Sequence, residues 1–149
     1  MGSEMCIRDS SYVKYPANSH PDILAVGAMS PCGERTNPSS CDGESWWGSD
    51  YGAEQDVVAP GVLISTTDRQ GSSGYNTNGS GNYPNIDYMN NFNGTSSACP
   101  HVAGVAALVL SANPTLTVEE VNNIIEQSAK KVRPDLYSYI TISLSLIHI

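Results

Sequence analysis

The fold of this chain is decided by the stretch Asn93-Gly-Thr-Ser-Ser-Ala-Cys-Pro-His-Val-Ala-Gly104. A strand-like segment reaches Asn93 and Gly94, turns, and enters a helix at Thr95 and Ser96. A serine at the start of a buried helix holds its hydroxyl near unpaired backbone N–H groups, which can stabilise a developing oxyanion. Gly94 lets the backbone approach a ligand closely. Taken alone, however, this pattern more often indicates a serine that only caps its helix.

Two helices are predicted from this stretch onward. Residues 96–112 are apolar almost all round, which is typical of a buried helix. The second helix begins with a capping box, with Thr117 as N-cap and Glu120 three residues later, and runs to about Lys131. Its inner stripe is predicted to consist of Val121, Ile124, Ile125 and Ser128.

The chain before the motif alternates short strands with polar segments. The nearly continuous apolar run of residues 22–29 suits a strand covered on both faces, as in a parallel sheet. Residues 56–61 and 62–66 are predicted as two further short strands. Residues 30–52 are predicted as a loop. Residues 67–91 are predicted to form a long polar loop. Loops of this length are usually either functional or flexible insertions.

The composition excludes several classes of protein. A chain of 149 residues fits one domain. A net charge of −8 argues against a nucleic-acid partner, because such proteins carry a basic patch or stripe. No run approaches the ~20 apolar residues that cross a bilayer, so no membrane partner is expected.

Residues 94–104 closely resemble the nucleophile motif of the subtilisin-like serine proteases (subtilases), Gly-Thr-Ser-x-Ala-x-Pro-His-Val-Ala-Gly, at every fixed position. Two further stretches follow in the family's order, Tyr15-Pro16 with residues 23–28 and then residues 56–61. The resemblance covers roughly residues 14–132. It implies an α/β fold: part of the subtilisin-like three-layer fold, with a mostly parallel sheet and packed helices, incomplete at both ends.

The resemblance also implies roles for individual residues. Ser96 would be the nucleophile that forms an acyl-enzyme, and its own N–H would donate to the oxyanion. Asn93, Gly94 and Thr95 would border the oxyanion site and the cleft, with Asn93 on the leaving-group side.

A second set of positions would form the primary substrate pocket. The resemblance implies that Tyr15, Pro16 and Ala17 lie near this pocket, with a cis peptide bond between Tyr15 and Pro16. The neighbouring Lys14 is interpreted as an ordinary exposed lysine.

A catalytic base is missing from the sequence. Of the three histidines, His101 lies about 140° round the helix from Ser96 and points away from it. His20 precedes a strand, where the family has no catalytic histidine, and His148 lies near the chain's end. The family's Asp and His motifs, Asp-Ser/Thr-Gly and His-Gly-Thr-His, and its oxyanion asparagine are not in the sequence either.

Two functional hypotheses follow from this pattern. The first is that the chain is the C-terminal part of the catalytic domain of a secreted, monomeric serine endopeptidase, with protein or peptide substrates. In that case the chain alone is inactive. The alternative is a pseudoprotease or extracellular binding module that reuses the fold.

The cysteines allow one surface disulfide. Cys32 and Cys41 bracket a polar loop, and a bridge between them fits an exported protein, with two reduced thiols as the alternative. Cys99 is expected to be a small buried residue behind the site rather than a redox-sensitive thiol.

No metal ligand is assigned and no cofactor is required. Subtilases often bind calcium, so a structural calcium ion is an option. Its candidate oxygen ligands are Asp68, Asn76, Asn78 and Asp87. The favoured interpretation is that these four residues are ordinary polar side chains in contact with solvent.

Both ends carry a second resemblance, to translated sequencing-adapter read-through. It rests on Met5-Cys-Ile-Arg-Asp-Ser10 and Ser143-Leu-Ser-Leu-Ile-His-Ile149. Residues 1–10 are therefore interpreted as an artefact or disordered arm, 11–141 as the catalytic portion and 142–149 as an artefact tail. The alternative is a native arm and a native C-terminal strand, which the Ile and Leu alternation of residues 140–149 would also fit.

Overall fold

The computed structural model describes residues 11–79 and 83–137. The elements follow in the order β1 (Val26–Met29), β2 (Val57–Pro60), β3 (Ile64–Thr67), the 3₁₀ turn η1 (Gly71–Ser73), β4 (Tyr88–Phe92), α1 (Thr95–Ala112) and α2 (Val118–Ser128). The two terminal segments assigned to adapter sequence, and the strand predicted over residues 140–149, lie outside the described residues.

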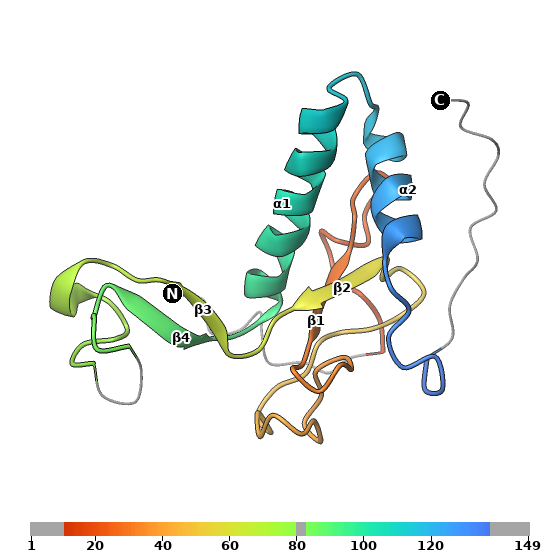
Figure 1. The fold of residues 1–149 in the computed structure, drawn as a ribbon. Coiled ribbons are helices and arrows are strands. Elements are labelled where there is room, and N and C mark those ends of the chain that lie inside the picture. Colours follow the sequence, from red (N-terminus) through yellow and green to blue (C-terminus); the bar gives the residue numbers. More distant parts are fainter. Residues whose placement is uncertain (1–10, 80–82, 138–149) are drawn as a thin grey trace.

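Two small sheets organise the molecule (Figure 1). Strands β1 and β2 are parallel, with Val26 opposite Val57 and Ala28 opposite Ala59. Strands β3 and β4 form an antiparallel hairpin that extends away from the helices. The parallel pair confirms the α/β class.

The first strand is shorter than the predicted run of residues 22–29. Ile23 lies in a turn, where its N–H donates to the carbonyl of His20. The N–H of Ala25 donates to the Asp56 carboxylate at 2.6 Å. The Ala25 carbonyl still accepts from the N–H groups of Asp56 and Val57, but its own N–H bonds to a side chain instead of the neighbouring backbone, and β1 begins at Val26.

The core lies where α1 and α2 meet the parallel sheet. Ala98 and Val102 of α1 pack with Val121 and Ile125 of α2. Trp47, from the segment between β1 and β2, is buried in the same cluster. The predicted capping box of α2 is confirmed, because the Thr117 hydroxyl accepts from the N–H of Glu120 and the Glu120 carboxylate accepts from the N–H of Thr117. Of the predicted inner stripe, Ser128 is exposed.

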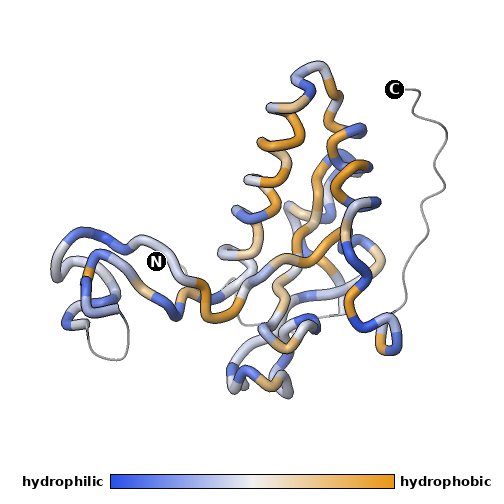
Figure 2. Tube along the Cα trace, in the orientation of Figure 1, coloured by the Kyte–Doolittle hydropathy of each residue, from blue (hydrophilic) through white to orange (hydrophobic). Residues whose placement is uncertain are grey.

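The prediction that α1 is buried all round is wrong for the described residues. Apolar residues run along this helix (Figure 2), yet only Ser97, Ala98 and Val102 are buried. Leu108 is 70% exposed. One face packs on β1, β2 and α2, and no other element in the described part of the chain covers the opposite face. By length and composition alone α1 could also span a membrane.

The long excursion of residues 67–91 has more structure than predicted. It contains η1 and ends in β4, which pairs with β3. Buried Asn76 lies at its centre, with only 3% of its surface exposed.

Candidate active site

The site begins at the junction between β4 and α1. Gly94 is the N-cap of α1 and has a φ of 118°, a conformation that favours glycine. Its N–H donates to the carbonyl of Gly61 at 2.8 Å. The start of α1 is thereby attached to the chain that leaves β2.

Ser96 and Ser97 have opposite environments at this junction. Ser97 is buried, and its hydroxyl donates to the carbonyl of Gly94 at 2.7 Å and lies 3.3 Å from that of Gly61. Ser96 is exposed, in the second position of the helix. Because Gly94 is the N-cap, the interpretation of Ser96 as a simple helix cap is wrong. Only Ser96 of the two serines presents its hydroxyl at the surface.

A cavity of about 370 Å³ adjoins Ser96. Residues 13–17 line it, as do Thr95 and Ser96 from the start of α1. Tyr15, Pro16 and Ala17 therefore share a cavity with Ser96, although they lie far from it in sequence. The peptide bond between Tyr15 and Pro16 is cis.

Asn93 and Gly94 do not line this cavity. The Asn93 side-chain oxygen accepts from the N–H of Leu63 at 2.6 Å, which ties the end of β4 to the start of β3. In this structure the Asn93 side chain therefore closes the base of the β3–β4 hairpin.

Residues 47–50 form a wall of the cavity that the sequence pattern did not predict. Trp47 is 1% exposed, and its indole N–H has no hydrogen-bond partner among the described residues. The Ser49 hydroxyl accepts from the N–H of Ala28 at 3.0 Å. The adjacent pair Trp46-Trp47 inside a polar loop was the available signal, because large aromatic residues seldom remain in solvent without a partner.

Lys14, interpreted as an ordinary exposed lysine, has a partner. Its ammonium group lies 3.4 Å from the Asp50 carboxylate and 5.7 Å from the centre of the Tyr12 ring. Both residues of this pair line the cavity.

Neither histidine in the described part of the chain lines the cavity with Ser96. His101 Nδ1 lies 2.8 Å from the carbonyl of Ser97, one turn earlier on the helix. His20 Nδ1 accepts from the N–H of Asp22 at 3.2 Å on the surface. His148 lies outside the described residues. Ser96 is thus exposed beside a preformed cavity, and neither described histidine is positioned as its base.

Comparison with known proteins shows the family of the chain. A family model described as the subtilase family matches residues 5–140. The chain belongs to the subtilase family.

The subtilase relatives in curated collections include a calcium-dependent protease of Nostoc sp., 40% identical over 118 residues. Subtilisin amylosacchariticus of Bacillus subtilis subsp. amylosacchariticus is 37% identical over 136 residues. A cold-adapted subtilisin-like serine proteinase of known structure superimposes with a TM-score of 0.53 at 29% identity, over 76% of this chain and 32% of that one. These relatives confirm the subtilisin-like fold.

This subtilase chain spans a small share of its relatives. It aligns over 78% of its own length with the Nostoc protease but covers 17% of that protein. The corresponding shares for subtilisin amylosacchariticus are 91% and 29%.

Cys32 and Cys41 of this subtilase form a disulfide with a Cα–Cα distance of 6.1 Å. Cys99 is free and exposed, so its prediction as a buried residue is wrong. It lies on the part of α1 that no described element covers, which leaves its thiol in solvent.

Two of the four candidate calcium ligands, Asp68 and Asp87, have carboxylates that already accept backbone N–H groups. The Asp68 carboxylate accepts from the N–H groups of Arg69 and Asn76 at 2.8 and 2.7 Å. The Asp87 carboxylate accepts from the N–H of Gly71 at 2.8 Å. Amide protons, rather than an open coordination sphere, face these oxygens. Among the described residues, no group of three or more His, Cys, Asp or Glu side chains could hold a metal.

Proposed function

We propose that this chain is the nucleophile-bearing part of a secreted subtilisin-like serine endopeptidase that cleaves proteins or peptides. The single observation that carries the proposal is the exposed Ser96 at the start of α1, beside the cavity of residues 13–17. The family provides the reaction class, and the cavity provides room for a substrate side chain.

Ser96 Oγ attacks the carbonyl carbon of the scissile peptide bond. A base takes the hydroxyl proton and returns it to the leaving nitrogen as the C–N bond breaks and the acyl–Ser96 ester forms. Water then hydrolyses the ester. The Ser96 N–H, in the first turn of α1 where backbone donors lack helical partners, supplies one hydrogen bond to the oxyanion.

The base, its orienting acid and the second oxyanion donor come from chain outside these residues. Two observations support this view: neither described histidine lines the cavity, and the chain covers 29% of subtilisin amylosacchariticus. The 149-residue chain by itself is therefore inactive.

The disulfide and the charge of the chain indicate the compartment and the partners of the enzyme. A surface disulfide between Cys32 and Cys41 fits an oxidising, extracellular compartment. Catalysis by Ser96 needs no cofactor. The net charge of −8 gives no basis for nucleic-acid binding, and the parent enzyme acts as a monomer. In that enzyme α1 is a core helix rather than a membrane span, since it already packs on β1 and β2.

A matched pair of serine variants tests the proposal in the longer protein encoded by the genomic region. Ser96→Ala lowers kcat/KM for an unstructured peptide by roughly 10⁶-fold, the scale recorded when a subtilisin loses its nucleophile. Ser39→Ala is the control, because Ser39 is exposed in the loop closed by Cys32 and Cys41 and does not line the cavity. Equal activity of both variants would refute the assignment of Ser96.

The alternative function is a pseudoprotease or extracellular binding module. It is favoured by the absence of a described histidine beside Ser96. The upstream reading frame separates the two. Intact Asp and His motifs in the family's order support the protease, whereas a degenerate His motif with Ser96 intact supports the binding module.

A further inference from the structure

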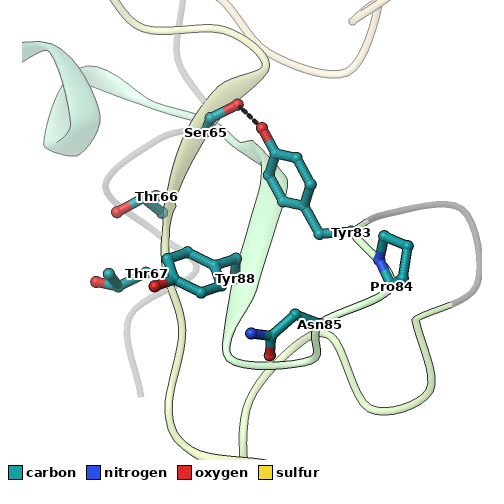
Figure 3. A pocket seen from close by; sticks show the side chains of 7 residues that line it. All are labelled: Ser65, Thr66, Thr67, Tyr83, Pro84, Asn85 and Tyr88. Carbon is teal, nitrogen blue, oxygen red and sulfur yellow. Dashed lines mark hydrogen bonds between the residues drawn. The ribbon is translucent and has the colours of Figure 1, made fainter.

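The β3–β4 hairpin carries a second cavity, apart from the one beside Ser96. Its volume is about 520 Å³, within the range of ligand pockets. Residues 65–67 of β3 form one wall, and residues 83–85 with Tyr88 form the other (Figure 3). The function proposed for Ser96 does not use this hairpin pocket.

Hydrogen bonds from the interior of the hairpin hold the second wall in place. The side-chain amide of buried Asn76 donates to the carbonyls of Tyr83 and Tyr88 at 2.9 and 2.7 Å. Its side-chain oxygen accepts from the N–H of Gly79 at 3.0 Å. One buried residue thus fixes the backbone of both tyrosines, and the pocket is preformed.

Asp68 supports Asn76 from the other side. Its carboxylate accepts from the N–H of Asn76 at 2.7 Å. A Cβ at Gly74 would lie 2.5 Å from the same carboxylate, so a residue with a side chain would displace it. The backbone hydrogen bonds, first that from Asn76, lower the pKa of Asp68. The Asp68 carboxylate that holds Asn76 in place is therefore ionised at neutral pH.

The lining of the pocket selects for an uncharged, apolar ligand. Tyr83 and Tyr88 meet edge to face, with ring centres 6.5 Å apart and an interplanar angle of 82°. Among the described residues no Asp, Glu, Lys, Arg or His lines the pocket, and the pocket surface is mainly apolar. A ligand with a charged group would therefore lose hydration here without gaining a partner.

Three polar side chains of the lining, those of Ser65, Tyr83 and Asn85, already have hydrogen-bond partners. The Tyr83 hydroxyl is 2.9 Å from that of Ser65 (Figure 3). The Asn85 side-chain oxygen accepts from the N–H of Asp87 at 3.0 Å. A sugar needs several hydrogen-bonding partners, whereas a proline-containing peptide needs an aromatic surface. The lining favours the peptide.

The pocket is also within reach of a substrate bound at Ser96. Strand β4 runs from Tyr88 at the pocket to Phe92, four residues before Ser96. Fully extended chain covers at most about 3.3–3.6 Å per residue, so Tyr88 and Ser96 are at most about 29 Å apart. A polypeptide that continues some eight residues past the scissile bond spans this distance.

We propose that the hairpin pocket is an accessory subsite that binds an uncharged, proline-containing segment of the polypeptide substrate, on the leaving-group side of the scissile bond. The choice of substrate and side rests on the function proposed for Ser96. The pocket itself needs no catalytic group, so binding is measurable without turnover.

The test titrates the acetylated and amidated peptide Gly-Pro-Pro-Pro-Gly into the ¹⁵N-labelled 149-residue chain and follows amide chemical shifts. Saturable shifts are expected at Tyr83, Asn85 and Tyr88. Tyr88→Ala weakens binding at least about tenfold, because half of the aromatic surface is lost. The control is Tyr75→Ala, a tyrosine of the same hairpin that is 83% exposed and outside the lining. The affinity of the Tyr75→Ala variant for the peptide stays within about twofold of that of the unmodified chain.

A second variant covers the case in which Tyr88→Ala does not fold. Thr67 is exposed on β3, so Thr67→Glu keeps the strand and places a charge in the wall; it also weakens binding at least about tenfold. Absence of saturable shifts, equal effects of Tyr75→Ala and Tyr88→Ala, or preferential binding of chitotriose at these residues would each overturn the proposal. Peptide binding without cleavage by the longer protein would refute the proposed function alone, and cleavage without peptide binding would refute the subsite alone.

Discussion

Gly61 and Gly94 are the residues that fix the position of Ser96. A Cβ at Gly61 would lie 2.5 Å from the Ala28 Cβ and 3.1 Å from the Gly94 carbonyl oxygen. Only glycine allows the end of β2 to approach the start of α1 this closely. The motif predicted a glycine before the nucleophile, but the matching requirement at Gly61 follows from a contact between distant segments and has no local signal.

The pair of carboxylates Asp56 and Glu126 makes stability depend on pH. Desolvation, and secondly the negative charge of Asp56, raise the pKa of Glu126. A carboxyl group whose pKa is higher in the folded state than in the unfolded state stabilises the fold at low pH. This contribution is lost as the pH rises from the unfolded-state pKa through the folded-state pKa. Glu126→Gln therefore stabilises the chain at pH 7 and not at pH 4. Solvent screens this partly exposed group, so the gain in unfolding free energy is at most a few tenths of a kcal/mol.

Urea unfolding of Glu126→Gln and the unmodified chain at the two pH values measures this difference. A stabilisation at pH 4 equal to that at pH 7 would show that the effect comes from packing and not from charge.

Among the elements, the best predicted are those with local signals. The capping box at Thr117 fixed the start of α2, and apolar runs located β1 and β2 to within a few residues. The exposed face of α1 could not be predicted, because its residues are those of a core helix and exposure depends on what packs against them. The ordered structure of residues 67–91 could not be predicted either, because it depends on hydrogen bonds from one buried asparagine, Asn76, to the backbone.

The loop closed by Cys32 and Cys41 is the element whose stability depends most on one bond. Replacing both cysteines by serine lowers the free energy of unfolding by about 2–3 kcal/mol, from the lost constraint on the unfolded chain. Cys99→Ser is the control, because its thiol is free and exposed. Urea unfolding under non-reducing conditions measures both variants. A loss of less than about 0.5 kcal/mol in the double variant would mean that the bridge is not formed.

The uncovered face of α1 gives a prediction that separates the chain from the longer protein. Leu108 is 70% exposed here, so Leu108→Gln changes the unfolding free energy of the 149-residue chain by less than about 0.5 kcal/mol. In the longer protein, where we expect further chain to cover α1, the same change costs more than about 2 kcal/mol. Denaturant titrations of both proteins provide the comparison. Equal costs in the two would contradict the proposed covering of α1.

At the scale of the whole molecule, the chain is one part of a subtilase rather than the compact domain that its length suggests. It aligns over 91% of its own residues with subtilisin amylosacchariticus yet covers 29% of that protein. In the described part of the chain the parallel sheet has two strands, β1 and β2. Because this sheet is small and only one face of α1 is packed against other elements, we expect the isolated chain to be marginally stable.

We expect Ser96 to become a nucleophile only when the rest of the catalytic domain is present. Mass spectrometry after treatment with a fluorophosphonate tests it most directly, because displacement of fluoride from phosphorus requires an activated serine. We expect one phosphonylated residue, Ser96, in the longer protein and no adduct at Ser96 in the 149-residue chain. A longer protein without an adduct at Ser96, or stoichiometric labelling of Ser96 in the chain alone, would contradict it.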